Sequence, residues 1–246
     1  MSIVFCILQQ DYVLLAADSR HTRGDLQACY KSDRGVKTIE ILKGRGALGF
    51  TGEDIGEQIV FPAKREQLLD DQPGLKEAAD KLAEFGRTVY QTTSGGQQGV
   101  VEIMLAGFEN DSRDGITAAC YVLRSPGFVP CAVFFPYLCF EIIGRSRHGA
   151  LYGLHRFVER NMDLDVALRV AVFVLREICE QDTTVGGQPH IYVIRRDSKK
   201  NQAEVRDLTP LVSWAEKAGK HLSVVMLTGL VPSIDSVSDT EMKSGG

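Results

Sequence analysis

The sequence predicts an α+β fold, a four-layer αββα sandwich in which helices cover the outer faces of two stacked sheets. Short apolar runs and helical patterns follow one another in the order strands, two helices, strands, two helices, strands. The first two strands are apolar at successive positions, which indicates that both of their faces are covered. No linker or repeat divides the 246 residues, so residues 1–230 are expected to form one domain and residues 231–246 a disordered tail.

Four strands are expected before the first helix, over residues 2–8, 12–17, 36–42 and 47–51. Three polar residues join the first two strands, which suits a hairpin. Gly44 and Gly46 mark a turn between the last two. Thr51 and Asp54 then form a capping-box-like helix start, and Pro62 is expected to kink or end that helix.

A second helix is expected over residues 75–90, because apolar residues recur there at helical spacing. The remaining strands are expected at 100–109, 115–123, 140–144, 190–197 and 204–208. Two more helices are expected, over 149–160 and 163–180. The last of these is apolar almost all round, which predicts that other layers or a neighbouring subunit enclose it.

The composition argues against several classes of protein. A net charge of −4 and a pI near 5.8 do not favour nucleic-acid binding. Six cysteines without disulfide-like or zinc-like spacing indicate reduced thiols. No basic segment precedes the first apolar stretch, and the most apolar segment, 128–143, is too short for a membrane span. We therefore expect a soluble cytoplasmic protein without nucleic-acid or membrane partners.

Two familiar motifs are set aside by their context. Residues 44–49 match GxGxxG, but they lie between two strands rather than between a strand and a helix, so a hairpin turn is the better interpretation. Residues 144–149 lack the spacing of the GxSxG nucleophile elbow. The five histidines show no metal-ligand spacing, so no metal and no other cofactor is expected.

Lys37 and Asp18 place charge next to the predicted core. Strand periodicity puts Lys37 on the same face as Ile39 and Ile41, and Asp18 ends the apolar run 12–17. A buried lysine needs an anion or loses its proton, and Asp18 is the obvious partner. The alternative is that Lys37 occupies a solvated strand end.

Ser2 is the first residue of the first predicted core strand, 2–8, and directly follows Met1. Removal of Met1 would give Ser2 a free α-amine, whose ordinary pKa of about 7.7–8.0 suits a general base near neutral pH. A hydroxyl activated by its own amine is an established nucleophile. The alternative is that Ser2 is merely a common residue after the initiator.

Five segments together resemble the proteasome β-type family of N-terminal nucleophile hydrolases, most of all its divergent bacterial homologues. They are VLLAADSRHTRG, KTIEI, GFTGEDIGEQI, FEIIGRSRHGALYGL and DTTVGGQPHIYVI, and the resemblance covers residues 2–214. It implies an αββα sandwich of the N-terminal nucleophile hydrolase type. It also implies a threonine-type peptidase, here with serine, that assembles into homo-oligomeric rings and takes peptides or unfolded proteins, with an ATPase unfoldase as a further partner.

The resemblance also implies a role for individual residues. Ser2 would be the nucleophile, Lys37 the cation beside its hydroxyl, Asp18 the carboxylate that holds the lysine, and Gly52 the N–H donor to the oxyanion. The other implied positions are a loop support, a carboxylate near the amine, the serine of a glycine-serine turn and three substrate contacts: Arg20, Asp182, Ser146, His21, Thr22 and Phe50.

The chain departs from the family pattern in four respects that bear on activity: Lys37 lies a few residues later than is typical, the glycine-serine turn reads GRSR, and two residues near the reaction centre differ. The nucleophile is serine rather than threonine, and Val185 stands where a second serine near the amine is usual. These departures keep two alternatives open: a non-catalytic ring subunit, and an N-terminal nucleophile amidase that acts on a small molecule.

Overall fold

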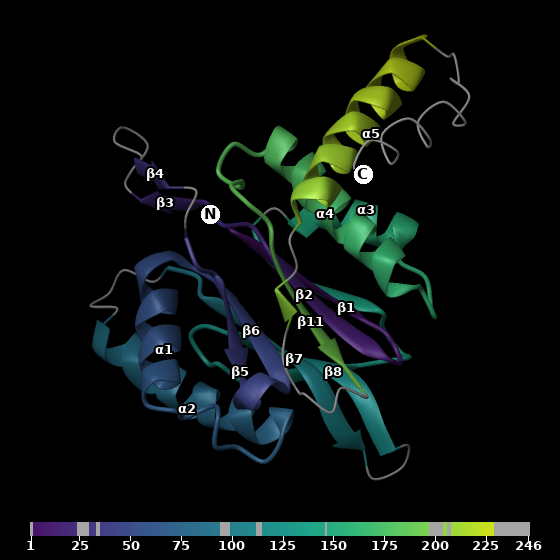
Figure 1. Ribbon diagram of the computed structural model, residues 1–246. Coiled ribbons are helices and arrows are strands. Elements are labelled where there is room, and N and C mark those ends of the chain that lie inside the picture. Colours follow the sequence, from purple (N-terminus) through teal and green to yellow (C-terminus); the bar gives the residue numbers. More distant parts are fainter. Residues whose placement is uncertain are drawn as a thin grey trace, which may run out of the picture.

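The computed structural model describes residues 2–23, 30–32, 35–93, 99–111, 115–145, 147–196, 204–205 and 208–228. Two five-stranded antiparallel sheets and a two-stranded ribbon form the β structure of these residues, and five α-helices accompany them (Figure 1). The expectation of a mixed fold with two sheets is confirmed. None of the helices in the described ranges is both long and apolar enough to cross a bilayer.

The first sheet contains both strands of the predicted N-terminal hairpin. Its strands, in spatial order, are β10 (Phe140–Gly144), β1 (Ile3–Leu8), β2 (Tyr12–Ala17), β11 (His190–Arg195) and β12 (Glu204–Val205). Every residue of β1 and β2 is buried, as their continuous apolar sequence predicted. β1 therefore has β2 on one side and β10 on the other, and Ile3 pairs with Gly144.

The second sheet is built mainly from the middle of the chain. Its strands, in spatial order, are β5 (Thr38–Ile41), β6 (Gly46–Thr51), β7 (Glu102–Asp111), β8 (Gly115–Arg124) and β9 (Cys131–Phe134). The turn η1 (Leu42–Gly44) connects β5 to β6, which agrees with the hairpin interpretation of the GxGxxG match. β3 (His21–Arg23) and β4 (Tyr30–Ser32) form the ribbon. The sequence did not predict β3, β4 or β9.

The helices lie on the two outer sides of the sheets (Figure 1). They are α1 (Glu53–Arg65), α2 (Leu75–Thr93), α3 (Arg147–Phe157), α4 (Leu164–Gln181) and α5 (Thr209–Thr228). The predicted order is wrong at its end, because α5 follows the last strand. α4 packs on β2 with α3 and α5 against it, so other layers cover one side of the helix, whereas Val166 is 47% exposed and the expectation of a helix enclosed all round is met only in part.

The start of α1 corrects two expectations about helix ends. Thr51 is the last residue of β6, and Gly52 is the N-cap residue, in a left-handed conformation without a side-chain cap. The capping-box prediction is therefore wrong. Pro62 lies inside α1, which continues for three residues beyond it.

Three clusters of apolar side chains fill the spaces between the sheets and the helices. One contains Ile3, Phe5 and Leu14 of the first sheet together with side chains of α3, α4 and α5. The second lies between the sheets, where Val4 and Cys6 meet side chains of β6, β7 and β8. The third fills the space between the second sheet and α1 and α2. Because neighbouring residues of β1 enter different clusters, the strand has no polar face.

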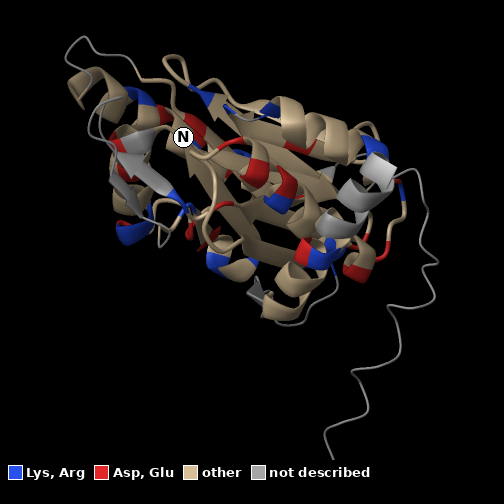
Figure 2. Cartoon of the chain, turned by 90° about the horizontal axis from the view of Figure 1, so that it is seen from above, with Lys and Arg blue, Asp and Glu red and all other residues tan. Residues whose placement is uncertain are grey.

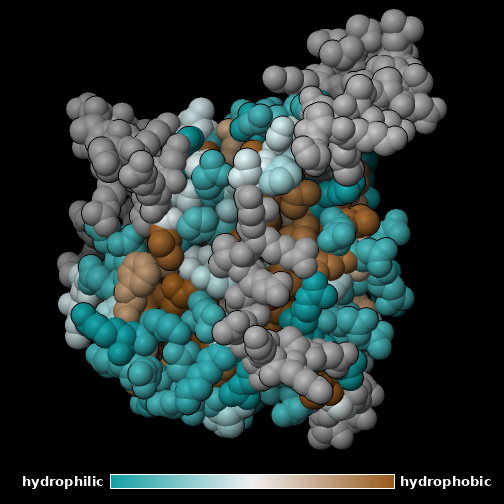
Figure 3. All heavy atoms as spheres, in the orientation of Figure 1, coloured by the Kyte–Doolittle hydropathy of each residue, from teal (hydrophilic) through white to brown (hydrophobic). Residues whose placement is uncertain are grey.

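The described surface is mixed in character. In the view of Figure 2, acidic and basic residues are interspersed. On the face shown in Figure 3, hydrophilic residues predominate, with smaller hydrophobic patches between them. This distribution agrees with the modest net charge of the sequence.

Candidate active site

Asp18 is a buried carboxylate at the end of β2, only 2% exposed. Its Oδ1 accepts a hydrogen bond from the backbone N–H of Ile3 at 3.0 Å, and its Oδ2 accepts one from the N–H of Gly186 at 3.2 Å. These two donors replace part of the water that a carboxylate loses on burial. Asp18 is therefore held between the start of β1 and the loop before β11.

Lys37 lies against this carboxylate. Its Nζ is 2.7 Å from Oδ2 of Asp18, and the two side chains are 3% and 1% exposed. Burial lowers the pKa of Lys37 from its ordinary value, while the charge of Asp18 opposes that change. The prediction that Asp18 partners Lys37 is confirmed, and the alternative of a solvated strand end is wrong.

The Lys37 ammonium keeps capacity for another contact. An ammonium carries three N–H donors, and Nζ meets Asp18 as an ion pair. Within the described ranges, Nζ has no hydrogen-bond acceptor of good geometry. A buried donor in this condition is costly unless a further group or a bound molecule completes it.

Ser2 lies half-buried at a cavity of about 350 Å³. The cavity lies where the ends of both sheets meet the start of α1, and its walls are formed by Ser2, Thr51, Gly52, Asp54, Ile55, Gly99, Val100, Glu102, Gly144 and Arg145. Ser2 immediately precedes Ile3, whose N–H binds Asp18. The residues expected to be nucleophile and oxyanion donor, Ser2 and Gly52, therefore share one cavity.

Gly52 needs to be glycine. Its φ of 101° lies in the left-handed region, and a Cβ there would collide with the carbonyl oxygen of Val100. Its carbonyl accepts the N–H of Gly56 at 3.2 Å, which begins α1. The first backbone N–H groups of a helix lack intrahelical acceptors and favour negative charge, so this end of the cavity suits an anion.

The loop after α4 wraps around Asp18. Arg20 donates from Nη1 to the carbonyl oxygens of Thr183 at 3.1 Å and Val185 at 3.2 Å, and its backbone N–H donates to the carbonyl of Gly186 at 2.9 Å. Asp182 follows the last turn of α4, and its Oδ1 accepts the N–H of Thr184 at 2.9 Å. Arg20 thus supports the loop as the resemblance implied, and Asp182 stands at the base of that loop.

The other expected residues are placed less directly. Phe50 is 3% exposed, and its ring meets that of Phe61 on α1 at 5.8 Å, so it lies in the core rather than on the cavity wall. His21 and Thr22 lie in β3, and the description of that ribbon is confined to its backbone. Ser146 lies outside the described residues.

The sequence analysis missed three polar residues at or near the site: His190, Cys179 and Glu102. His190 opens β11 opposite Ala17, and burial, aided by the charge of Lys37, lowers the pKa of His190. Burial raises the pKa of the Cys179 thiol to about 11, with a further contribution from Asp18. Glu102 lines the Ser2 cavity and is 4% exposed. Glu102 lies within an apolar run of the sequence, and this pattern could have indicated a buried charge.

The groups at the site include the Ser2 hydroxyl, the Glu102 carboxylate and the Asp18–Lys37 ion pair, which is bonded to the backbone N–H of Ile3. In the part of the chain that the structure describes, no three His, Cys, Asp or Glu side chains gather as metal ligands. A hydroxyl that lines a cavity together with the backbone at a helix start can act as a nucleophile, with the N–H groups there available for an oxyanion.

Comparison with solved structures identifies the same fold in three proteins. Anbu (ancestral beta-subunit) from Yersinia bercovieri superposes with a TM-score of 0.72 at 18% identity, over 92% of this chain and 97% of that one. Anbu from Pseudomonas aeruginosa, described as a helical assembly, gives 0.71 at 20% identity, over 94% and 97%. The Anbu (Gly-1) mutant from Hyphomicrobium sp. strain MC1 gives 0.67 at 15% identity, over 91% and 97%.

Comparison by sequence adds nothing to this result, since no protein-family model and no curated protein matches the chain. Identities of 15–20% establish a shared fold and not a shared activity. The chain therefore has the fold of the Anbu structures.

Proposed function

We propose that the chain is a subunit of a self-compartmentalising, proteasome-like peptidase of the β type, with Ser2 as the nucleophile once Met1 has been removed. Its domain is, on this proposal, a four-layer αββα sandwich of the N-terminal nucleophile hydrolase type, located in the cytoplasm. The three apolar clusters between successive layers support that architecture.

The proposed reaction has two steps. The free α-amine of Ser2 takes the hydroxyl proton as Oγ attacks the scissile carbonyl, and the N–H of Gly52 stabilises the oxyanion. Lys37, held by Asp18, stabilises the charge that develops on Oγ. The protonated amine then gives its proton to the leaving amine, and an ester joins Ser2 to the acyl group. Water hydrolyses this ester by the same acid–base sequence in reverse.

The observation that supports the proposal is the buried Lys37–Asp18 ion pair, which is bonded to the backbone N–H of Ile3, the residue after Ser2. Charges almost fully removed from water are costly, and they concentrate at functional sites. Asp18 reaches Lys37 with one oxygen and the residue after Ser2 with the other. Asp18 thus links the Lys37 cation to the start of β1, which is consistent with the proposed role of the lysine.

A non-catalytic ring subunit is the second candidate, and one observation favours it. Val185 is fully buried and belongs to the apolar cluster below the first sheet. It therefore supplies no hydroxyl to assist the amine of Ser2. On this alternative the fold is retained for assembly while the chemistry is lost.

Self-association is part of the proposal in either case. Anbu from Pseudomonas aeruginosa forms a helical assembly. We expect this chain to form homo-oligomers, with peptides or unfolded proteins as substrates and an ATPase as a partner. Light scattering after size-exclusion chromatography tests the first expectation, because a monomer at micromolar concentration would contradict it.

Covalent labelling tests the catalytic proposal. Intact mass first establishes whether Met1 is removed. A peptide β-lactone is then expected to acylate the wild type once, at Ser2, and peptide mapping identifies the residue. Ser2→Ala should not be labelled, whereas Ser2→Thr should be, because threonine keeps the hydroxyl beside the amine. Retention of Met1, or equal labelling of wild type and Ser2→Ala, would refute Ser2 as the nucleophile.

A further inference from the structure

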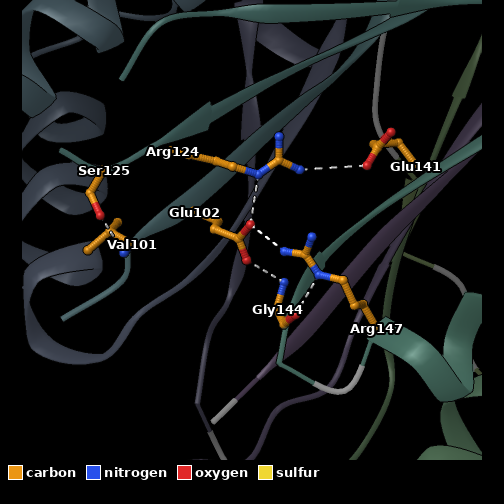
Figure 4. A network of polar contacts seen from close by, with 7 residues as sticks. All are labelled: Val101, Glu102, Arg124, Ser125, Glu141, Gly144 and Arg147. Carbon is orange, nitrogen blue, oxygen red and sulfur yellow. Dashed lines mark hydrogen bonds and ion pairs between the residues drawn. The ribbon is translucent and has the colours of Figure 1, made fainter. Parts of the chain in front are cut away.

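Glu102 is a buried carboxylate held by groups from three different elements (Figure 4). Its Oε1 accepts a hydrogen bond from Nε of Arg124 at 2.9 Å and another from Nη2 of Arg147 at 2.6 Å. Its Oε2 accepts the backbone N–H of Gly144 at 2.7 Å. Such charge-assisted bonds are the strong class of hydrogen bond, so the carboxylate is firmly fixed.

These contacts join the two sheets at the cavity. Glu102 begins β7 of the second sheet, and Arg124 lies directly opposite it on β8. Gly144 ends β10 of the first sheet, and Arg147 begins α3. Arg147 also donates from Nε to the carbonyl of Gly144 at 3.2 Å. The N–H of Gly144 is therefore bonded to Glu102 and its carbonyl to Arg147, and these two side chains are bonded to each other.

Gly144 in turn contacts the main chain of Ser2. It pairs with Ile3 in the first sheet and has a φ of 108°, a left-handed conformation suited to glycine. A Cβ at this position would collide with the carbonyl oxygen of Ser2. The turn at Gly144 is therefore the wall against which the Ser2 backbone rests, and both residues line the same cavity as Glu102.

We propose that Glu102 is a positioning residue for Ser2: through Gly144 it sets where the Ser2 backbone, and hence its amine and hydroxyl, stands in the cavity. The effect of Glu102 on catalysis rests on the proposed function. Its effect on the position of the Ser2 backbone rests only on the contacts of Gly144. We call the contacts of Glu102 and Arg147 with Gly144 the clamp. A displacement of about 1 Å at a reacting group can lower the reaction rate about a hundredfold, so loosening the clamp should change the rate measurably.

Two variants loosen the clamp in different ways. Glu102→Gln keeps an acceptor for Gly144 but removes the charge that binds both arginines. Arg147→Lys keeps the positive charge but replaces the two nitrogens that bond Gly144 and Glu102 with a single one, and it is the gentler change should Glu102→Gln fail to fold. Glu141→Gln is the matched control, since Glu141 reaches only the outer side of the cluster, 3.8 Å from Arg124.

Labelling kinetics with the peptide β-lactone provide the first measurement. We expect both clamp variants to lower the first-order labelling constant by about tenfold or more, with the half-saturating probe concentration changed by less than about twofold. Glu141→Gln should label as the wild type does. A merely structural role would reduce the fraction of folded protein, which leaves the first-order constant unchanged.

Hydrogen–deuterium exchange provides the second measurement, and it does not depend on activity. Segments 2–8 and 140–145 should exchange faster in the clamp variants and not in Glu141→Gln. Wild-type labelling rates in both clamp variants would overturn the inference, as would slow labelling without faster exchange. If the wild type itself is not labelled, the proposed function fails, and exchange alone decides: unchanged protection of residues 2–8 then refutes the positioning role of Glu102.

Discussion

Lys37 and Asp18 form an ion pair of 2.7 Å from which water is almost wholly excluded. The attraction between the two charges offsets the cost of removing them from water only while both are present. The pair is also tied to the backbone, because Asp18 binds the N–H groups of Ile3 and Gly186. If the proposed function holds, a change to this pair therefore affects both the stability of the fold and the reaction.

A double-mutant cycle on this pair is the first prediction. Lys37→Met and Asp18→Asn should each lower the free energy of unfolding by about 3–5 kcal/mol, because each leaves or weakens a buried charge. The double variant should lose clearly less than the sum of the two. Guanidinium denaturation followed by circular dichroism measures all four proteins, and strictly additive losses would contradict the coupling.

The second prediction concerns pH and His190. Burial lowers the pKa of His190 in the folded chain, so between that value and the unfolded value of about 6.5 the unfolded chain binds more protons. This group's contribution to stability is therefore full above pH 6.5 and is lost as the pH falls toward the folded pKa. The slope cannot exceed about 1.4 kcal/mol per pH unit for one proton.

His190→Gln should accordingly flatten the decline of the unfolding free energy from pH 7 to pH 5. His148→Gln is the control, because His148 lies exposed on α3. Urea titrations at half-unit pH intervals make the comparison. An unchanged slope in His190→Gln would show that another group causes the decline.

The Lys37–Asp18 pair was predictable because each charge interrupts or ends an apolar run, and a buried charge needs an opposite one. Glu102 likewise places a charge within an apolar run of the sequence, residues 100–105. Its partners, however, lie 22 and 45 residues away along the chain, and only the pairing of β7 with β8 and the meeting of the two sheets bring them together. Sequence patterns locate buried charge more readily than they identify the tertiary partner.

The missed elements have local explanations. α5 begins with Thr209 and Pro210, a combination that favours a helix start, but the sequence analysis assigned no helix or strand between residue 208 and the expected tail at 231–246. β9 has four residues and lies at the edge of its sheet, where period-two patterning is weak. Phe50 was assigned to the cavity from its distance to Gly52 along the chain, whereas its ring packs against α1.

The third prediction uses thiol reactivity to probe the surroundings of Asp18. A thiol with a pKa of about 11 is ionised about a hundredfold less at neutral pH than one with the ordinary value of 9.0. Iodoacetamide at pH 7.5 should therefore modify the exposed Cys131 long before Cys179. Because the charge of Asp18 contributes to the raised pKa of Cys179, Asp18→Asn should accelerate its modification.

Peptide mapping of timed samples measures both rates. Cys131 serves as the internal reference, so a general loosening of the protein is recognised by faster reaction at every buried thiol, Cys6 and Cys120 included. Equal rates at Cys131 and Cys179 in the wild type would contradict the burial of Cys179.

The last prediction separates backbone strain from steric exclusion at Gly52. Gly52 and Gly115 both have positive φ, 101° and 78°, so alanine at either position incurs a left-handed penalty of about 1–2 kcal/mol. A Cβ at Gly115 meets nothing within 4 Å, whereas one at Gly52 collides with the backbone of Val100 and Val101. Gly52→Ala should therefore cost about 1–3 kcal/mol more in unfolding free energy than Gly115→Ala.

On the proposed function, in which the N–H of Gly52 binds the oxyanion, the collision should also displace that donor. Labelling of Ser2 by the peptide β-lactone should then fall in Gly52→Ala by about a hundredfold, the usual loss when one oxyanion donor is removed, and remain unchanged in Gly115→Ala. Denaturation and labelling are measured on the same samples. If Gly52→Ala lowers the unfolding free energy as expected but is labelled at the wild-type rate, the steric prediction holds and the catalytic one is wrong. The oxyanion would then be bound by another donor.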